Sequence, residues 1–360
     1  MSPQGRPKGE FPSVKHEGTL MSPPGRPKGE FRSAKHGGRL MTHRQTAMTR
    51  QQWALWVIFS APIAVLSVLA VTDNAPLFFK TFLNGLTLAS LYFLVASGFT
   101  LVFGLMRNVN LAHGSLYLFG AYVGWFVGEH TGSWVLAVLA GFFASALLGL
   151  LMQLLVFRHM QGQDLRQTLV TIGLSIVLAD LMLWAWGAEI YTFDPPAWIY
   201  GSTTLPLVEK FPTYRLVVLL AAIAIGVGLW WLLARTRIGM MIRAGVDDRG
   251  MLAASGVNVQ LVFAVTFAIG AGLAGLAGVV GGTALSISPG EDTRYLLASL
   301  VVVIVGGMGS VGGAAIGALL IGLAEQFGQA YAPTYSVVFT FVIMVVALAF
   351  KPRGIMGKAA

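Results

Sequence analysis

Three polar side chains interrupt long apolar segments of this chain. Asp180 lies in the run SIVLADLMLWAW, Glu325 lies in LLIGLAEQFGQA, and Asn84 lies near the start of an earlier apolar run. A carboxylate at the centre of a membrane costs about 3 kcal/mol on insertion scales, so such groups usually face a bundle interior or an aqueous cavity. We predict that Asn84, Asp180 and Glu325 line a polar path. The alternative is that the two carboxylates lie at the membrane interface or pair helices.

A second polar group occupies the segment RNVNLAHGSLYLFG, which contains Arg107, Asn110, His113 and Gly114. His113 has no second metal ligand at a workable spacing, so we predict no metal site here. We expect these side chains to cap the following helix and to bond to neighbouring backbone, while Gly114 permits a tight backbone approach.

The segment Arg235–Asn258 combines four Arg and two Asp with large apolar residues, among them Met240, Met241, Ile242, Met251 and Leu252. Asp247 or Asp248 can cap a short helix that ends near Gly256. Such an amphipathic element could lie on the membrane surface or insert into a groove of a cytoplasmic partner. In the second case the apolar residues are the expected anchors.

Several kinds of chemistry are absent from the sequence. It has no cysteine and no GxxxxGK[ST] phosphate loop, so we expect no thiol chemistry and no nucleotide hydrolysis by this chain. It has no Ser nucleophile motif and no clustered His, Asp and Glu. We therefore predict that the protein is not an enzyme and needs no cofactor or metal.

The composition predicts the elements that carry these residues. Of 360 residues, 56% are hydrophobic and only 11% are charged, whereas a soluble domain has about 25% charged residues. The apolar runs are too long and uniform for barrel strands, so we predict an all-α transmembrane bundle of eight to ten spans. The candidate spans are Trp53–Val71, Thr81–Leu105, Leu111–Val127, Ser133–Phe157, Thr168–Trp186, Leu216–Ala234, Leu261–Gly281, Tyr295–Gly306, Gly312–Tyr331 and Ser336–Phe350.

The region from Tyr295 to Tyr331 leaves two alternatives. Its first part, Tyr295–Gly306, is about 18 Å long as a helix, which is short for a hydrocarbon core of about 30 Å. It is either a short tilted span or a re-entrant half-helix.

Glycines recur at helical spacing from Gly272 to Gly282 and again at Gly313 and Gly317, which predicts close packing of these helices. The alternative is that the glycine-lined helices slide or part to open a path.

The distribution of charge predicts the orientation. With the amino terminus inside, the inner loops of the core hold ten Lys or Arg and the outer loops hold four. Both termini are therefore predicted to be cytoplasmic.

Residues 1–50 hold ten basic and three acidic residues, and the first twenty residues match the next twenty at fifteen positions. We expect this tail to be disordered, with no nucleic-acid partner, and residues 51–356 to form the membrane domain.

Three segments resemble the branched-chain amino-acid ABC transporter permeases, and the order of segments resembles the H-type subunit. The first segment carries the Gly-Leu-x-Arg-x-Asn-x-Ala-His-Gly run, which includes Arg107, Asn110, His113 and Gly114. RTRIGMMIRAGVDDRGMLAASGVNV is similar to the family's cytoplasmic coupling loop. SLVVVIVGGMGSVGGAAIGALLIG is similar to its glycine-rich late segment. The resemblance covers roughly residues 78–356.

The resemblance implies an ATP-driven importer of small polar metabolites, with branched-chain amino acids as the favoured substrate, in a bacterial inner membrane. The implied partners are a second permease subunit, two cytoplasmic ATPase subunits, a periplasmic substrate-binding protein and membrane lipid. It assigns ATPase docking to the loop 235–258, through residues Met241, Arg243, Ala244, Asp248, Leu252 and Gly256. The family's acid-Ala-Ala step is replaced here by Gly250-Met251-Leu252.

Two alternatives to this function remain. One is a self-sufficient secondary transporter or channel, which would need ion-coupling groups within its spans. The other is the same type of permease serving urea or short amides.

The tail is predicted to be dispensable, because it is duplicated and separate from every predicted span. Deleting residues 1–40 should leave membrane insertion and uptake near normal, measured as transport at equal membrane abundance. A collapse of uptake would show that the tail has a role.

Overall fold

The computed structural model describes residues 50–106, 109–160, 162–205 and 208–357. Contacts divide the chain into two units, Met1–Ser60 and Ala61–Ala360. In the first unit the described residues, Arg50–Ser60, are helical. The tail that carries the sequence repeat, and that we predicted to be disordered, lies outside the described residues.

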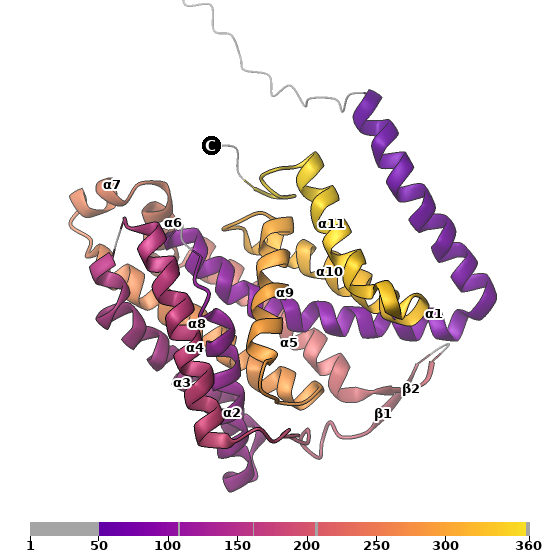
Figure 1. Cartoon of the computed structure of the whole chain (residues 1–360), viewed down its shortest axis with the longest axis horizontal. Coiled ribbons are helices and arrows are strands. Elements are labelled where there is room, and N and C mark those ends of the chain that lie inside the picture. The colour runs from indigo at the N-terminus through magenta and orange to yellow at the C-terminus, as the bar shows by residue number, and fades with distance from the viewer. Residues whose placement is uncertain (1–49, 107–108, 161, 206–207, 358–360) are drawn as a thin grey trace, which may run out of the picture. The chain divides into compact units, whose positions relative to one another are not determined.

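The described residues are almost all helical, which confirms the predicted all-α membrane class (Figure 1). The long helix α1 (Arg50–Met106) has one non-helical residue, Asn74, at which its two parts meet. The helices that follow are α2 (His113–Thr131), α3 (Trp134–Leu155), η1 (Phe157–Met160), α4 (Asp164–Trp186), α5 (Thr213–Arg235), α6 (Arg237–Asp247), α7 (Arg249–Ala254), α8 (Val259–Ala284), α9 (Glu291–Gly306), α10 (Val311–Tyr331), η2 (Pro333–Tyr335) and α11 (Ser336–Phe350).

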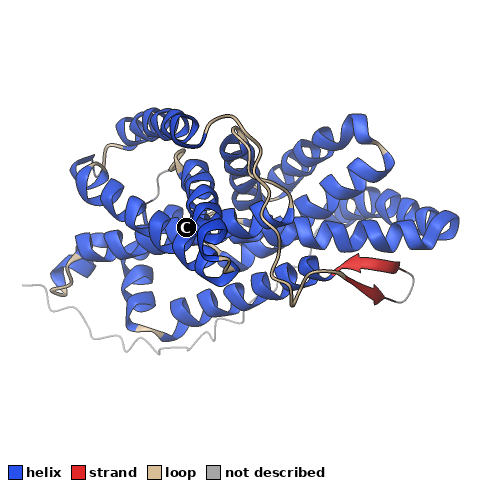
Figure 2. Ribbon diagram, turned by 90° about the horizontal axis from the view of Figure 1, so that it is seen from below, coloured by secondary structure: helices blue, strands red, loops and turns tan. Residues whose placement is uncertain are grey.

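A short hairpin, which the sequence did not predict, precedes α5. Its strands β1 (Ser202–Leu205) and β2 (Val208–Pro212) pair antiparallel, with Ser202 opposite Pro212. Figure 2 shows the two strands beside the helices. The hairpin therefore belongs to the connection between α4 and α5.

Six of the described helices are long and apolar enough to cross a membrane: the part of α1 from Asn74 to Gly104, α3, α4, α5, α8 and α10. The other four predicted spans fall on the first part of α1 and on α2, α9 and α11. The region from Tyr295 to Tyr331 forms two separate helices, and α9 begins at Glu291, four residues before the predicted start. Its 16 residues extend about 24 Å.

Glycine permits the close packing of α2, α3 and α8, which lie together in Figure 1. A Cβ atom on Gly120 would overlap the Cα of Gly275 and lie 2.7 Å from the Oγ of Ser145. That buried hydroxyl donates a hydrogen bond of 3.0 Å to the carbonyl of Leu116. Small residues let helix backbones approach closely in lipid. Gly275 is one of the glycines for which close packing was predicted, and these contacts confirm that role; Gly120 was not in the predicted set.

One end of the second unit gathers three parts of the chain. A Cβ atom on Gly104, near the end of α1, would lie 3.2 Å from the Cα of Gly309 in the α9–α10 turn. The N–H of Ile355 donates to the carbonyl of Val305 at 2.9 Å. That carbonyl is one of the last of α9 and has no acceptor role within its own helix. The carboxy-terminal segment therefore closes the end of α9.

Helices α4 and α5 leave most of their apolar surface exposed in this single chain. Ile176 and Trp184 of α4 and Leu220 and Trp230 of α5 are all exposed. By contrast, every residue of α1 from Thr87 to Val102 is buried. A bundle in lipid can expose apolar helix faces at little cost, so the buried helices form its centre and α4 and α5 its apolar exterior.

We predict that Gly120→Val destabilises the protein, because the added carbons meet the backbone of α8. Overpacking typically costs about 1–3 kcal/mol. Gly173→Ala in α4 is the matched control, since nothing lies within 4 Å of its Cβ position. The measurement is the thermal unfolding midpoint of the purified protein in detergent. Equal midpoints for the two variants would contradict the packing role of Gly120.

Candidate functional site

Helices α9 and α10 form an antiparallel pair that places two charged residues opposite each other. A Cβ atom on Gly306 would overlap the carbonyl of Gly313, so the two backbones touch near the turn. Arg294 lies twelve residues before Gly306, and Glu325 lies twelve residues after Gly313. The same register therefore brings Arg294 and Glu325 to the same level of the α9–α10 pair.

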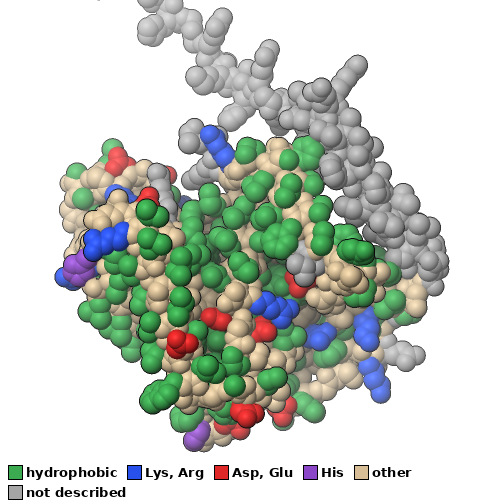
Figure 3. Space-filling model, in the orientation of Figure 1, with side chains coloured by type: hydrophobic (Ala, Val, Ile, Leu, Met, Phe, Trp, Pro, Cys, Tyr) green, Lys and Arg blue, Asp and Glu red, His purple; other side chains and the backbone are tan. Residues whose placement is uncertain are grey.

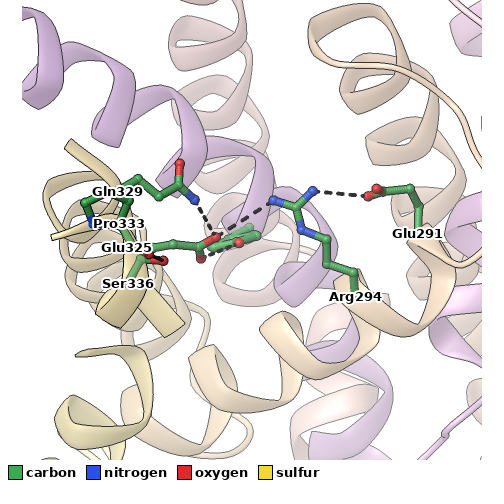
Figure 4. Close-up of polar contacts among 7 residues, drawn as sticks. Glu291, Arg294, Glu325, Gln329, Pro333 and Ser336 are labelled. Atoms are coloured by element: carbon green, nitrogen blue, oxygen red, sulfur yellow. Dashed lines mark hydrogen bonds and ion pairs between the residues drawn. The ribbon is translucent and has the colours of Figure 1, made fainter. Parts of the chain in front are cut away.

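Glu325 is the centre of a polar network (Figure 4). Its Oε2 accepts a hydrogen bond of 2.6 Å from the hydroxyl of Tyr92 on α1, and its Oε1 accepts one of 3.3 Å from Gln329. The Nη2 of Arg294 lies 3.8 Å from Glu325 Oε1, and its Nη1 lies 3.5 Å from Glu291 Oε2. The network thus joins α1, α9 and α10.

Three buried tyrosines pack under the guanidinium. The ring of Tyr295 stacks on that of Tyr117 at 4.2 Å between centroids and meets Tyr92 edge-on at 6.1 Å. The Cζ of Arg294 lies 5.9 Å from the centroid of Tyr295. Aromatic faces attract cations, so this layer supports the position of Arg294.

The network combines one cation with two carboxylates and remains partly open. The side chain of Arg294 is 46% exposed, that of Glu291 21% and that of Glu325 16%. Figure 3 shows acidic and basic side chains gathered over α9 on an otherwise largely hydrophobic face. An accessible group of this kind can bind a polar or charged ligand by ion pairs and hydrogen bonds.

Asn84 belongs to a neighbouring polar contact. Its side-chain oxygen accepts a hydrogen bond from Arg215 at the start of α5. The next residue, Gly85, packs against α10 near Leu323. Two of the three residues predicted to line a path, Asn84 and Glu325, therefore lie along the contact between α1 and α10.

Asp180 does not join them. We expected it to face the bundle interior, but its side chain is exposed on α4. The buried residues of α4 are Gln167, Thr171 and Met182, so Asp180 falls outside the face that packs. The sequence placed the residue in the correct helix, but only the packing of α4 decides which face is buried.

Four polar residues that shape the site were not predicted, namely Tyr92, Glu291, Arg294 and Arg215. Both arginines lie just outside the predicted spans, which begin at Leu216 and Tyr295, whereas in the structure each lies in the first turn of a helix. The spacing of Glu291 and Arg294, three residues apart, is a helical ion-pair signal that was available in the sequence. The tyrosine contact joins distant segments and has no local signal.

The motif after α1 is buried, and its side chains bond to nearby backbone as expected. The expected cap is wrong, because the N-cap residue of α2 is Ala112 and no side chain caps this helix. The Oδ1 of Asn110 accepts a hydrogen bond of 3.1 Å from the N–H of Ala112, and His113 Nε2 lies 3.1 Å from the carbonyl of Val95. A Cβ atom on Gly114 would overlap the carbonyl of Asp292 in α9. This motif therefore holds α2 against α1 and α9. Arg107 lies outside the described residues.

The segment Arg235–Asn258 forms two short helices, α6 and α7. The side chain of Thr236 accepts from the N–H of Gly239 and caps α6, and that of Asp248 accepts from Met251 and caps α7. Asp248 was one of the two predicted caps, and Gly256 follows α7 with a φ of 80°.

The apolar residues of this segment divide into two groups. Ile242 and Leu252 are buried, and Ile242 packs with Phe263 of α8. They are therefore unavailable as the anchors for a partner that we expected, because they hold α6 and α7 on this chain. Met240 is 52% exposed and Met251 is 70% exposed. The exposed face also includes Arg243 and Ala244, while Met241 is partly buried.

Known proteins match most of this chain. The matching family, described as "Branched-chain amino acid transport system / permease component", covers residues 81–348. The high-affinity branched-chain amino acid transport system permease protein BraD of Pseudomonas aeruginosa is 30% identical over 296 residues, which are 78% of this chain and 96% of that relative.

Two further relatives are similar over comparable lengths. The high-affinity branched-chain amino acid transport system permease protein LivH of Escherichia coli K12 is 30% identical over 299 residues, 78% of this chain and 96% of its own length. The ribose import permease protein RbsC of the same organism is 29% identical over 280 residues, 73% of this chain and 83% of its own. No solved structure matches the chain significantly. The protein is therefore a multi-pass membrane permease of the branched-chain amino acid transport system permease family.

Proposed function

We propose that this chain is the membrane-spanning permease subunit of an ATP-driven importer whose substrates are branched-chain amino acids. The observation that carries the proposal is the 30% identity to permeases of that transport system across 96% of their length. The similarity to a ribose import permease places the chain in a wider group of importers for small polar metabolites. The proposed location is a bacterial inner membrane.

The proposed partners supply what this chain lacks. Its sequence has no phosphate loop, so two cytoplasmic ATPase subunits provide hydrolysis. A periplasmic binding protein delivers the substrate. A second permease subunit completes the pore. The exposed apolar faces of α4 and α5 suit contact with lipid or with that second permease.

We propose that the network around Glu325 forms part of the transport path. Arg294 lies at most about 18 Å from the α9–α10 turn along the helix, which is within a hydrocarbon core of about 30 Å if that turn lies at the membrane boundary. A half-exposed guanidinium at such a depth is costly against lipid, so it faces water, substrate or a partner subunit. We therefore place the substrate path beside α9 and α10.

Coupling to the ATPase is assigned to the exposed face of α6 and α7. Met240 and Met251 offer apolar anchors, and Arg243 lies beside them on the same segment. Helices that dock in a partner's groove usually bind through a few such anchors. Because Ile242 fixes α6 against α8, a force applied to α6 would move a core helix. This link allows hydrolysis to drive alternating access.

Both termini and the α6–α7 segment are predicted to be cytoplasmic. The contacts of Gly104 with Gly309 and of Ile355 with Val305 support a shared end for the end of α1 and the carboxy-terminal segment, which carries Lys351 and Arg353. Reporter fusions after Lys358 should report the inside, and fusions within Asp194–Lys210 the outside. The same side for both fusions would contradict this topology.

We predict that Met240→Asp and Arg243→Glu each release the ATPase subunits while the permease still inserts. Loss of one charge from a desolvated interface pair costs about 2–5 kcal/mol, and a buried carboxylate in place of an apolar anchor is also unfavourable. Met240→Leu and Arg243→Lys are the matched controls, since they keep the apolar surface and the charge. The measurements are co-purification of the ATPase and substrate-stimulated hydrolysis in reconstituted vesicles.

Two results would contradict these proposals separately. If Met240→Asp and Arg243→Glu both retain the ATPase and full stimulation, α6 and α7 are not the coupling element. If the wild-type permease alone moves substrate against a gradient without an ATPase, the protein is a self-sufficient transporter.

A further inference from the structure

The polar network beside α9 has the charges that an amino acid needs for recognition. A zwitterionic amino acid presents a carboxylate and an ammonium group a few bonds apart. Arg294 supplies a planar guanidinium, and the carboxylates of Glu325 and Glu291 lie on either side of it at 3.8 and 3.5 Å. Guanidinium groups bind carboxylates through paired N–H donors, and ammonium groups bind carboxylate oxygens.

The ion pairs of Arg294 do not use up the N–H donors of its guanidinium group. Both N···O distances exceed the 2.7–2.9 Å that is typical of a charge-assisted hydrogen bond. The guanidinium therefore keeps donors for a ligand, and its 46% exposure leaves it accessible.

Glu325 is held in place by groups other than Arg294. Tyr92, which is buried in α1, donates to its Oε2 at 2.6 Å, and Gln329 donates to its Oε1. The carboxylate thus stays oriented if Arg294 turns towards a ligand.

An apolar residue also lies next to the charged group. Leu297 is three residues after Arg294, on the same face of α9, and is 53% exposed. A ligand with a charged head and a branched aliphatic side chain meets both kinds of surface there.

We propose that Arg294 binds the carboxylate of the transported amino acid and that Glu325 binds its ammonium group. This pair would thereby recognise the two charged groups of the substrate during translocation. This inference rests on the proposed function, because it takes an amino acid as the substrate. It assigns substrate recognition to the permease itself, in addition to the protein that delivers the substrate.

The test uses the complex of the full-length chain with its partner subunits, without the delivering protein, so that the permease alone is responsible for selectivity. Binding is measured by equilibrium dialysis with L-leucine, with L-leucinamide, which lacks the carboxylate, and with 4-methylpentanoate, which lacks the ammonium group. The wild type should bind L-leucine more tightly than either analogue.

Arg294→Gln should weaken L-leucine binding about tenfold or more while changing the affinity for L-leucinamide little, because only L-leucine uses the lost contact. Glu325→Gln should weaken binding of L-leucine and L-leucinamide but not of 4-methylpentanoate. Arg294→Lys keeps the ion pair with Glu325 but loses the planar fork, and should show an intermediate loss for L-leucine. Arg166→Gln, at an exposed arginine near the start of α4 that donates to Gln163 and takes no part in the network, is the control and should keep the wild-type order of ligands.

The outcomes separate this inference from the proposed function. Uptake of L-leucine by the complete importer tests the function, and its absence in the wild type would overturn that function. If uptake occurs but Arg294→Gln keeps the wild-type ratio of L-leucine to L-leucinamide affinity, the inference falls. It also falls if the wild-type complex transports L-leucine yet binds none at millimolar concentration. A uniform loss for all three ligands in Arg294→Gln and Arg294→Lys would assign the ion pair a structural role only.

Discussion

Apolar side chains gain little by leaving lipid for a neighbouring helix, so helices in a membrane associate through close packing and a few polar contacts. In this chain glycine provides that packing. Gly120 and Gly275 bring α2 against α8, and Gly306 and Gly313 bring α9 against α10. A single methyl group at these positions would meet backbone atoms. The arrangement of the central helices therefore depends on positions that carry no side chain.

The glycine contacts also determine where the charged side chains meet. Because α9 and α10 touch at Gly306 and Gly313, Arg294 and Glu325 lie at matching distances from the turn. Tyr92 then links Glu325 to α1, the most buried part of the bundle. A polar group that would be unfavourable in lipid is thereby held at one place by three helices. Its partial exposure makes it suitable for a ligand as well as for structure.

The surface divides into regions with different physical character. The faces of α4 and α5 are exposed and apolar, which suits lipid or another membrane subunit. The α6–α7 segment mixes exposed methionines with arginine and is anchored to α8 by Ile242. This division fits a permease that receives force at one end and passes substrate beside α9. The buried His113 motif belongs to neither region and connects α2 to its neighbours.

The sequence alone determined the membrane class and the position of nearly every helix, and it limited one helix cap to Asp247 or Asp248, because apolar runs, glycine spacing and capping are local signals. It also indicated Asn84 and Glu325 as polar residues with a special position. Only the tertiary structure decided that Asp180 is exposed, that Ile242 and Leu252 are buried, and that Arg294 meets Glu325. Those outcomes depend on which face of each helix packs and on contacts between segments far apart in the chain. No local pattern in one sequence contains that information.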